Sequence, residues 1–177
     1  MPLAVPNWAT NYVPGQFDTA AGMNVIGNNG TFLTNVPIFQ GWQSAAQSIA
    51  SGTVAAVGIT TTDVDSYAGH SNVTNTSRYT PTVPGWYLFI GSVSLVQNAS
   101  SNRLAEFRKN GAGSATNLGQ AVCLTPDTNN PSAVRPIALI YCNGTTDYVE
   151  LYAYQTSGSA LNTVPAQTGM TVLWMHA

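Results

Sequence analysis

The chain has 177 residues, a formal net charge of −2 at pH 7 and only 7% charged residues, against roughly 25% in an average soluble protein. Its length fits one domain, or one domain with an arm. Uncharged polar residues replace the charged ones, with 14 Ser, 21 Thr, 16 Asn and 8 Gln. Helical surfaces usually carry many Glu, Lys and Arg residues, so the single Lys and two Glu exclude an all-helical protein. The abundant Thr, Val, Tyr, Gly and Asn favour strands and turns.

Charge and hydropathy also bear on partners. The five basic residues are too few for the basic patch of a nucleic-acid-binding protein. No apolar run approaches the ~18 residues that span a bilayer, and the first residues lack the basic start and apolar stretch of a secretion signal. We therefore expect no nucleic acid and no membrane as partners. A surface so poor in charge suits a protein that is buried against other chains, which indicates an assembly component.

Residues 1–41 differ in texture from the rest and are expected to form an extended N-terminal anchoring arm. Four prolines and the turn signal at residues 27–30 interrupt this stretch. Only residues 18–24 are predicted to form a short helical turn, capped by Asp18 or Thr19. A disordered tail has fewer aromatic residues, so we expect the arm to dock on its own domain or on another chain. The candidate anchoring residues are Trp8, Tyr12, Phe17, Met23, Phe32 and Phe39.

Residues 42–177 alternate between apolar runs and turn signals, which predicts about eight to ten strands. The strongest prediction is an aromatic and β-branched strand over residues 86–96, which follows a Pro-rich turn. Further strands are predicted at 43–49, 53–59, 103–109, 118–124, 134–141, 148–154 and 170–175, and an irregular polar stretch at 63–75. This spacing of turns predicts an all-β antiparallel sandwich, either immunoglobulin-like or a jelly roll.

The chain lacks the short motifs of nucleophilic, zinc-protease, phosphate-loop and dinucleotide sites. His70 lies near Asp63 and Asp65, but we interpret it as a polar loop residue rather than a general base. The two aspartates resemble the start of a calcium loop, although no third acidic residue follows nearby. Cys123 and Cys142 are expected to be buried free thiols, with a cross-strand disulfide as the alternative. We predict no metal and no cofactor.

Glycosidase chemistry requires two facing carboxylates. Glu106 and Glu150 lie on separate predicted strands, which leaves such a pair open. Each is more simply a surface strand residue, paired with Arg103 or Arg108. We therefore expect no enzymatic activity.

Four aromatic residues on the predicted strands are candidates for a recognition surface. Trp86, Tyr148, Tyr152 and Tyr154 are of the residue types that stack on sugars. Tyr and Trp are also enriched in subunit interfaces. We favour the interface interpretation and keep sugar binding as the alternative.

Three blocks of sequence resemble the complement C1q/tumour-necrosis-factor-like jelly roll. Residues 78–81 and 84–90 are similar to the Tyr-x-x-Pro-x-x-Gly-x-Tyr-x-Phe pattern of that family, with stretched spacing. Residues 137–151 resemble its strand, Gly-Asp turn and strand, and residues 169–173 resemble its closing strand without the Phe. The resemblance covers roughly residues 42–177. It implies a ten-stranded jelly roll that forms a tight trimer and has no catalytic activity; no set of calcium ligands matches those of some members.

Residues 12–24 are similar to the Leu-Thr-Ala-Ala-x-Met-Asn leader of small virion proteins in phages of actinobacteria, which precedes the same kind of jelly roll. Here Phe17-Asp18 replaces the leucine and Gly22 fills the variable place. This resemblance implies a non-enzymatic bacteriophage virion protein on the particle exterior, made in the host cytoplasm. Both a capsid decoration protein and a tail or fibre component for host attachment fit it.

The resulting hypothesis is a homotrimer of the domain at 42–177, anchored to capsid or tail subunits by the arm at 1–41. The alternative is a carbohydrate-binding or receptor-binding module that uses Trp86, Tyr152 or Tyr154 to stack on a host surface glycan. A secreted cytokine-like ligand is a third hypothesis, which the missing signal disfavours.

Overall fold

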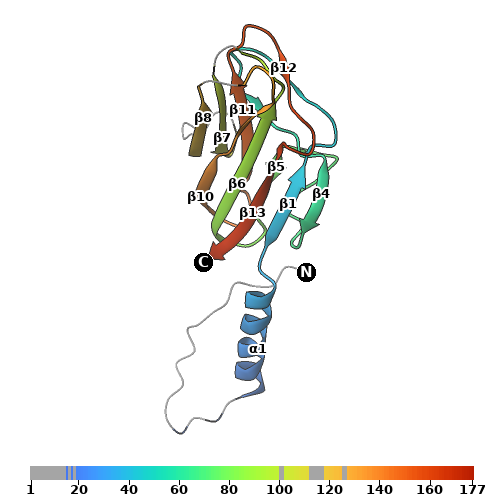
Figure 1. Cartoon of the computed structure of the whole chain (residues 1–177). Coiled ribbons are helices and arrows are strands. Elements are labelled where there is room, and N and C mark those ends of the chain that lie inside the picture. The colour runs from blue at the N-terminus through green and yellow to red at the C-terminus, as the bar shows by residue number, and fades with distance from the viewer. Residues whose placement is uncertain (1–14, 16, 18, 100–101, 112–117, 125–126) are drawn as a thin grey trace.

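The structure is a computed structural model and describes residues 15, 17, 19–99, 102–111, 118–124 and 127–177 (Figure 1). Two of the predicted anchoring residues, Trp8 and Tyr12, lie outside the described residues. The described chain forms a sandwich of antiparallel sheets with a helix below its base. The predicted all-β antiparallel sandwich is therefore confirmed.

The first sheet has six strands in the order β10, β6, β13, β1 and β4, and β9 also pairs with β6. This sheet faces the viewer in Figure 1. The bounds of its strands are β1 (Ile38–Trp42), β4 (Thr61–Asp65), β6 (Gly85–Leu95), β9 (Ser132–Val134), β10 (Ile137–Cys142) and β13 (Gly169–His176).

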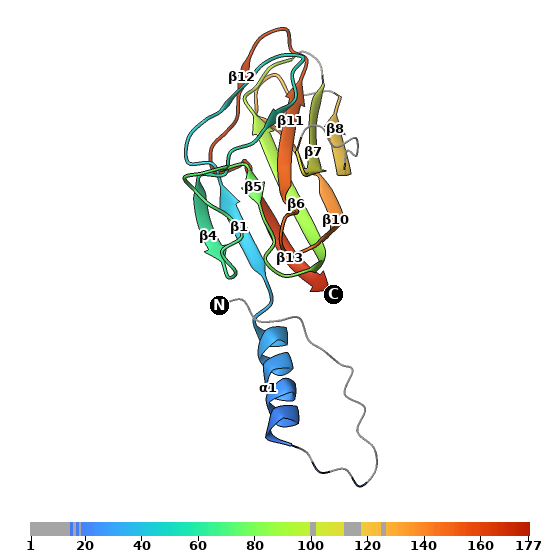
Figure 2. The same cartoon turned by 180° about the vertical axis from the view of Figure 1, so that it is seen from behind.

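The second sheet has five strands in the order β3, β11, β7 and β8, and β5 also pairs with β11. It lies nearer the viewer in Figure 2. The bounds of its strands are β3 (Ala55–Ala56), β5 (Arg78–Tyr79), β7 (Arg103–Lys109), β8 (Leu118–Cys123) and β11 (Val149–Gln155). A separate short pair joins β2 (Ser48–Ile49) to β12 (Leu161–Asn162).

The longest strand, β6, corresponds to the strongest prediction from the sequence. Its side chains alternate between the two faces of the sheet, as successive residues of a strand do. Tyr87, Phe89 and Val93 belong to the core, whereas Trp86 is partly exposed on the outer face. The strand therefore has an apolar side chain on both faces along most of its length.

An aromatic cluster fills the space between the two sheets. The rings of Phe39 and Tyr79 have their centroids 5.2 Å apart, and those of Phe89 and Phe107 are 5.5 Å apart. All four side chains are fully buried. Burial of each such side chain contributes about 1.5–3 kcal/mol to folding, and the contact geometry of the rings adds to this.

The helix α1 (Ala20–Thr34) is longer than the turn predicted at residues 18–24. Thr19 caps it, and its hydroxyl accepts a hydrogen bond from the Gly22 amide at 3.1 Å. Gly27 and Gly30, which predicted a loop, lie inside the helix, because a helical glycine costs only about 1 kcal/mol. The expectation of an arm extended throughout residues 1–41 is therefore wrong for α1.

The sandwich begins at Ile38, before the boundary expected at residue 42. Residues Ile38–Trp42 form β1, which pairs with β13 on one side and β4 on the other. Phe39 is consequently a core residue with no exposed surface and is not available as an arm anchor. This strand was not predicted from the sequence, because only the short linker at residues 35–37 separates it from the segment that was assigned to the arm.

Two predicted strands are shorter than expected. The segments at 43–49 and 53–59 retain only the two-residue strands β2 and β3. There the side chain of Gln47, rather than the backbone of a neighbouring strand, forms hydrogen bonds with backbone groups. Its amide donates to the Ala56 carbonyl at 2.8 Å, and its oxygen accepts from the Gly58 amide at 3.0 Å. Conversely, β4 overlaps the stretch that was expected to be irregular.

Candidate functional site

The outer face of the six-stranded sheet is apolar and at least partly exposed over β10, the first half of β6 and the end of β13. Side chains on adjacent strands lie opposite one another there: Ile137 pairs with Ile90, Leu139 with Leu88 and Tyr141 with Trp86, and β13 adds Leu173 opposite Leu88. The exposed fraction is 58% for Ile137 and 55% for Leu139. We call this surface the apolar face; it comprises Trp86, Leu88, Ile90, Ile137, Leu139, Tyr141 and Leu173.

Aromatic rings close the lower end of the apolar face. The Trp86 ring lies 5.7 Å from that of Tyr141 in an edge-to-face arrangement, and 6.4 Å from the His176 ring on the other side. A contiguous exposed apolar surface of this kind marks an interaction site in a soluble protein. The apolar face is therefore the main candidate for contact with another protein.

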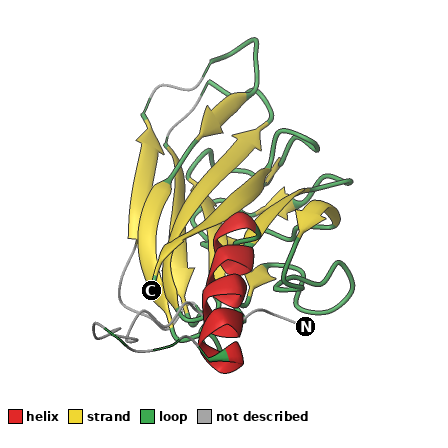
Figure 3. Ribbon diagram, turned by 90° about the horizontal axis from the view of Figure 1, so that it is seen from below, coloured by secondary structure: helices red, strands yellow, loops and turns green. Residues whose placement is uncertain are grey.

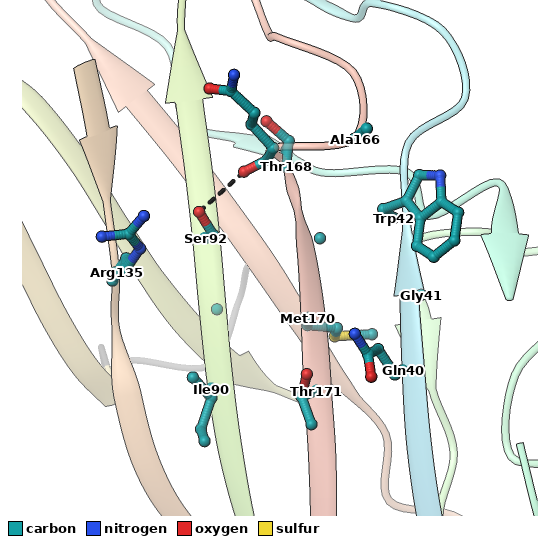
Figure 4. Close-up of a pocket in the computed structure, with 13 residues that line it drawn as sticks. Gln40, Gly41, Trp42, Ile90, Ser92, Arg135, Ala166, Thr168, Met170 and Thr171 are labelled. Carbon is teal, nitrogen blue, oxygen red and sulfur yellow. Dashed lines mark hydrogen bonds between the residues drawn. The ribbon is translucent and has the colours of Figure 1, made fainter. Parts of the chain in front are cut away.

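A hollow of about 220 Å³ lies at the upper end of the same sheet face (Figure 4). Gly169 belongs to its lining and lies directly between Ser92 of β6 and Trp42 of β1; a Cβ there would overlap the Gly41 carbonyl oxygen, so this position requires glycine. Figure 4 shows Arg135 and Trp42 on opposite sides of the hollow. The hollow is smaller than the ~300 Å³ at which most small-molecule pockets begin, so it suits a single side chain or one small polar group.

The outer face of the five-stranded sheet holds a charged network. The Glu150 carboxylate accepts hydrogen bonds from the Ser77 hydroxyl at 2.6 Å and from the Tyr152 hydroxyl at 2.9 Å. It also pairs with Arg78 at 3.4 Å. The guanidinium of Arg78 lies 4.0 Å from the centre of the Tyr148 ring, an arrangement that favours cation–π attraction.

A second ion pair continues this network. The Glu106 carboxylate accepts from Arg108 Nε at 2.6 Å and from Gln120 at 2.8 Å. Arg108 in turn lies 4.8 Å from the centre of the Tyr152 ring. Burial and the bond to Glu150 raise the pKa of Tyr152 to about 12. Both glutamates are thus held by structural partners, as expected for Glu106 with Arg108, but both are buried, so the expectation of surface strand residues is wrong.

The structure divides the four predicted recognition aromatics between the two sheets. Trp86 lies on the apolar face, whereas Tyr152 and Tyr154 project from β11, and Tyr148 directly precedes it, on the opposite side of the sandwich. Tyr152 is 6% exposed and is bonded within the charged network. Tyr154 is half-buried and lines a second hollow, of about 210 Å³, with Val54, Leu104, Glu106, Arg108 and Gln120.

The predicted anchoring residues also separate. Phe17 is 91% exposed and Met23 is 54% exposed. Phe32 is fully buried, with its ring centroid 4.9 Å from that of Trp174 and 6.4 Å from that of Tyr67. Phe32 therefore joins α1 to its own domain, and only Phe17 and Met23 remain exposed among the described anchoring residues.

The remaining candidates for chemistry have structural partners. Both ring nitrogens of His70 face backbone carbonyl oxygens, that of Arg78 at 2.8 Å and that of Ile59 at 3.1 Å. The Asp65 carboxylate accepts from the amides of Gly69 and His70. Within the described ranges, no three His, Cys, Asp or Glu side chains gather in a way that would hold a metal ion.

The two cysteines are free thiols. Cys142 is fully buried at the end of β10, and burial raises its pKa to about 12. Cys123 is half-buried at the end of β8.

Sequence reasoning missed the apolar face as a surface, although β10 carries a signal for it. Ile137, Leu139 and Tyr141 alternate with Ala138 and Ile140, so both faces of the strand are apolar. A strand that is apolar on both faces is usually covered on both sides. The core covers one face of β10, and the sequence thus indicated that a second surface covers the other face, without identifying that surface.

No described helix combines the length and the hydropathy of a membrane span. No family model matches the chain, and no curated protein matches it. Among solved structures, murine APRIL at pH 5.0 is similar, with a TM-score of 0.59 and 12% sequence identity over 78% of this chain and 98% of that chain. Eiger TNF from S. frugiperda has a TM-score of 0.56 at 12% identity, over 80% of this chain and 92% of that chain. The chain therefore has a TNF-like jelly-roll fold, which confirms the fold implied by the resemblance.

Proposed function

We propose that this protein is a non-enzymatic structural component that assembles as a homotrimer through its apolar face. The observation that carries the proposal is the contrast between its two sheets: the six-stranded sheet exposes the apolar face, whereas two ion pairs lie on the outer side of the five-stranded sheet. Exposed apolar area of this kind favours association by about 25 cal/mol for each Å² removed from water. The number of copies follows from the family resemblance, which implies a trimer.

The state of the ionisable groups supports a non-enzymatic role. Glu106 and Glu150 are the pair that a glycosidase would need, and their side chains are 1% and 6% exposed. Each carboxylate is occupied by an arginine and by a second donor. A carboxylate that must transfer a proton to a substrate has to reach it, which neither does here.

Within this proposal the trimer belongs to a bacteriophage virion, as a capsid decoration protein or a tail or fibre component. Two features of the sequence support it: the similarity of residues 12–24 to the leader of small virion proteins, and the low content of charged residues. Residues at the N-terminus, including Trp8, Tyr12 and Phe17, would contact capsid or tail subunits. Three such contacts in one trimer would act together and raise the avidity of attachment.

The attachment role can be tested by deletion of residues 1–18, since every described helix and strand begins later in the chain. We expect the shortened protein to keep the fold and trimer of the full chain but to lose co-sedimentation with purified virions of the source phage. Co-sedimentation equal to that of the full chain would contradict the anchoring role.

The trimer interface can be tested by a charge placed in the apolar face. Leu139→Glu puts a carboxylate on an exposed position of β10, and we expect it to convert the trimer into a monomer. Val73→Glu is the matched control, because Val73 is 87% exposed in the loop between β4 and β5. Size-exclusion chromatography with mass detection distinguishes the two; a trimer that survives Leu139→Glu would contradict the proposed interface.

A glycan-binding role is the second candidate, and the hollow beside Tyr154 favours it. The hollow lies on the sheet opposite the apolar face, so trimer formation would leave it open, and it combines an aromatic ring with the polar groups of Arg108 and Gln120. A glycan array should then give binding that Tyr154→Ala abolishes and Trp86→Ala preserves. Absence of glycan binding by the unmodified protein would rule this role out.

A further inference from the structure

The composition of α1 is unfavourable for an isolated helix. Its 15 residues include Gly22, Gly27 and Gly30 and three asparagines, and none of them is charged. Each glycine costs about 1 kcal/mol relative to alanine in a helix. Isolated helices of about this length are marginal in water even when their composition is favourable. Contacts outside the helix must therefore stabilise it.

The helix's own domain supplies such contacts at one end. Phe32 is buried against Trp174 and Tyr67, and the Tyr67 hydroxyl donates to the Asn35 carbonyl at 2.8 Å, just beyond the helix. Toward its N-terminus the helix projects from the base of the sandwich (Figures 1 and 3). All residues of α1 except Gly22, Asn29 and Phe32 are exposed, so the domain alone does not cover the rest.

The exposed apolar residues of α1 follow a heptad spacing. Met23, Ile26, Gly30 and Leu33 are separated by three, four and three residues, and this alternation brings them to one side of the helix. The exposed fractions of Met23, Ile26 and Leu33 are 54%, 50% and 51%. We call these four residues the helix seam. At about 100° per residue, its centre lies roughly 110° around the helix from the side formed by Asn29 and Phe32.

We propose that the helix seam packs against the same seam of the other copies, so that three α1 helices form a short parallel coiled coil at the base of the trimer. This inference rests on the trimer proposed above and adds a second interface to it. A repeat averaging 3.5 residues is the pattern by which helices pack along a shared seam. Gly30 has open space around it, which allows the neighbouring backbones to approach closely.

The attachment of α1 to the domain favours copies of this chain over another partner. Phe32 packs on Trp174 of β13, and the Trp174 indole donates to the Pro84 carbonyl at 3.2 Å. Pro84 directly precedes β6. Two residues further along the chain is Trp86, which lies at the lower end of the apolar face. The lower end of the apolar face and the attachment point of α1 therefore lie at the same end of the sandwich. Threefold symmetry of the proposed trimer gives all three helices the same direction.

Disulfide cross-linking of the full chain tests the inference. In a Cys123→Ser background, Ile26→Cys places a thiol in the helix seam, and Asn24→Cys places one on an exposed part of the helix roughly 140° away. A parallel coiled coil brings equivalent seam positions of two copies within the range of a disulfide. With oxidised glutathione, we expect the Ile26→Cys chain to form covalent dimers about tenfold faster than the Asn24→Cys chain.

Equal rates for the two variants in a sample that light scattering shows to be trimeric would overturn the coiled coil and leave the trimer intact. A monomeric sample would overturn both proposals at once. Circular dichroism of Ile26→Glu and Asn24→Glu gives an independent readout. We expect helical signal to be lost in Ile26→Glu alone, and equal signals would count against the seam.

Discussion

Two buried tyrosines show how single polar atoms affect this core. Tyr79 and Tyr87 are both fully buried. The Tyr87 hydroxyl donates to the Val83 carbonyl at 2.6 Å, whereas the Tyr79 hydroxyl has no hydrogen-bond partner among the described residues. A buried polar group without a partner costs about 1–3 kcal/mol, and a satisfied one contributes about 1 kcal/mol.

The two tyrosines therefore predict opposite effects of the same substitution. We expect Tyr79→Phe to raise the free energy of unfolding by about 1 kcal/mol, because it removes a hydroxyl that gains nothing from burial. Tyr87→Phe should lower it by a similar amount. Urea denaturation of both variants checks this; a loss of stability in Tyr79→Phe would mean that its hydroxyl has a partner in solution.

Gly119 predicts a larger effect of a small side chain. Its φ is +62°, and a Cβ there would overlap the carbonyl oxygen of Ile137. Gly158 also has a positive φ, of +85°, but has open space around it. Gly158→Ala should cost about 1–2 kcal/mol from the left-handed backbone alone, and Gly119→Ala should cost clearly more. Equal shifts of the two melting temperatures would show that the strand near Gly119 moves easily.

One of the two ion pairs of the charged network could be predicted from the sequence. The pairing of Glu106 with Arg108 could be expected, because residues two apart in a strand lie on the same face. The pairing of Glu150 with Arg78 could not, since it depends on β5 lying beside β11. Local sequence patterns do not show which distant strands become neighbours.

Among the elements, strands with strong local signals were predicted well. β6 was expected at 86–96 and spans Gly85–Leu95; its aromatic and β-branched residues favour a strand regardless of its neighbours. The predicted strand at 134–141 is divided into β9 and β10 around Pro136, whose missing amide hydrogen interrupts a ladder.

Elements stabilised by tertiary contacts were not predicted from local signals. The Gly-Asn-Asn-Gly segment indicated a loop, and it is helical in α1. The packing of the buried Phe32 against Trp174 and Tyr67 stabilises it instead. The hydrophobic spacing of Met23, Ile26 and Leu33 is present in the sequence, but the apolar residues of the whole segment 1–41 show no common period, so a helix was not predicted there.

The buried carboxylate of Asp147 lies in the turn between β10 and β11 and gives a further test. Burial would raise the pKa of Asp147, but hydrogen bonds from Asn110, Lys109 and the Asn143 amide outweigh it and lower the pKa below its ordinary 3.8. A lowered carboxylate pKa stabilises the fold above pH 4, and this contribution is lost as the pH falls through the folded-state pKa. We expect Asp147→Asn to destabilise the protein at pH 7 and to show a smaller loss of stability below pH 4. Parallel urea titrations at pH 7 and pH 3 check this, and an unchanged difference between the two would contradict it.

The whole molecule should be sensitive to alkali because several weak acids are buried. Burial raises the pKa of Cys142 from 9.0 to about 12, and it also raises the pKa values of Tyr79 and Tyr87. Above pH 9 the unfolded chain releases the Cys142 proton and the folded chain keeps it, so stability falls as the pH rises from 9 toward 12. The slope per group approaches about 1.4 kcal/mol per pH unit.

This contribution can be isolated by Cys142→Ala. The substitution lowers stability at every pH because it removes a buried side chain, but it should flatten the decline between pH 9 and pH 10, before most tyrosines of the unfolded chain ionise. Denaturation at pH 8, 9 and 10 measures the slope. A variant that declines as steeply as the unmodified protein would show that Cys142 does not contribute to it.

The distribution of polarity over the whole sandwich is the feature on which the account depends. The charged network of Glu106, Arg108 and Glu150 lies on one outer side, and the apolar face lies on the other. The sequence predicted the sandwich, which the structure confirms, and the trimer that its resemblance implies stays a prediction. It did not show which aromatics face which way, because that depends on the order of the strands within each sheet.

The mass of the full-length protein in solution, measured by light scattering over a dilution series, tests the central claim most directly. Three chains of 18.6 kDa give about 56 kDa, and the account predicts this mass down to low micromolar concentration. A mass of one chain at every concentration would contradict it, because the apolar face would then be stable in water without a partner.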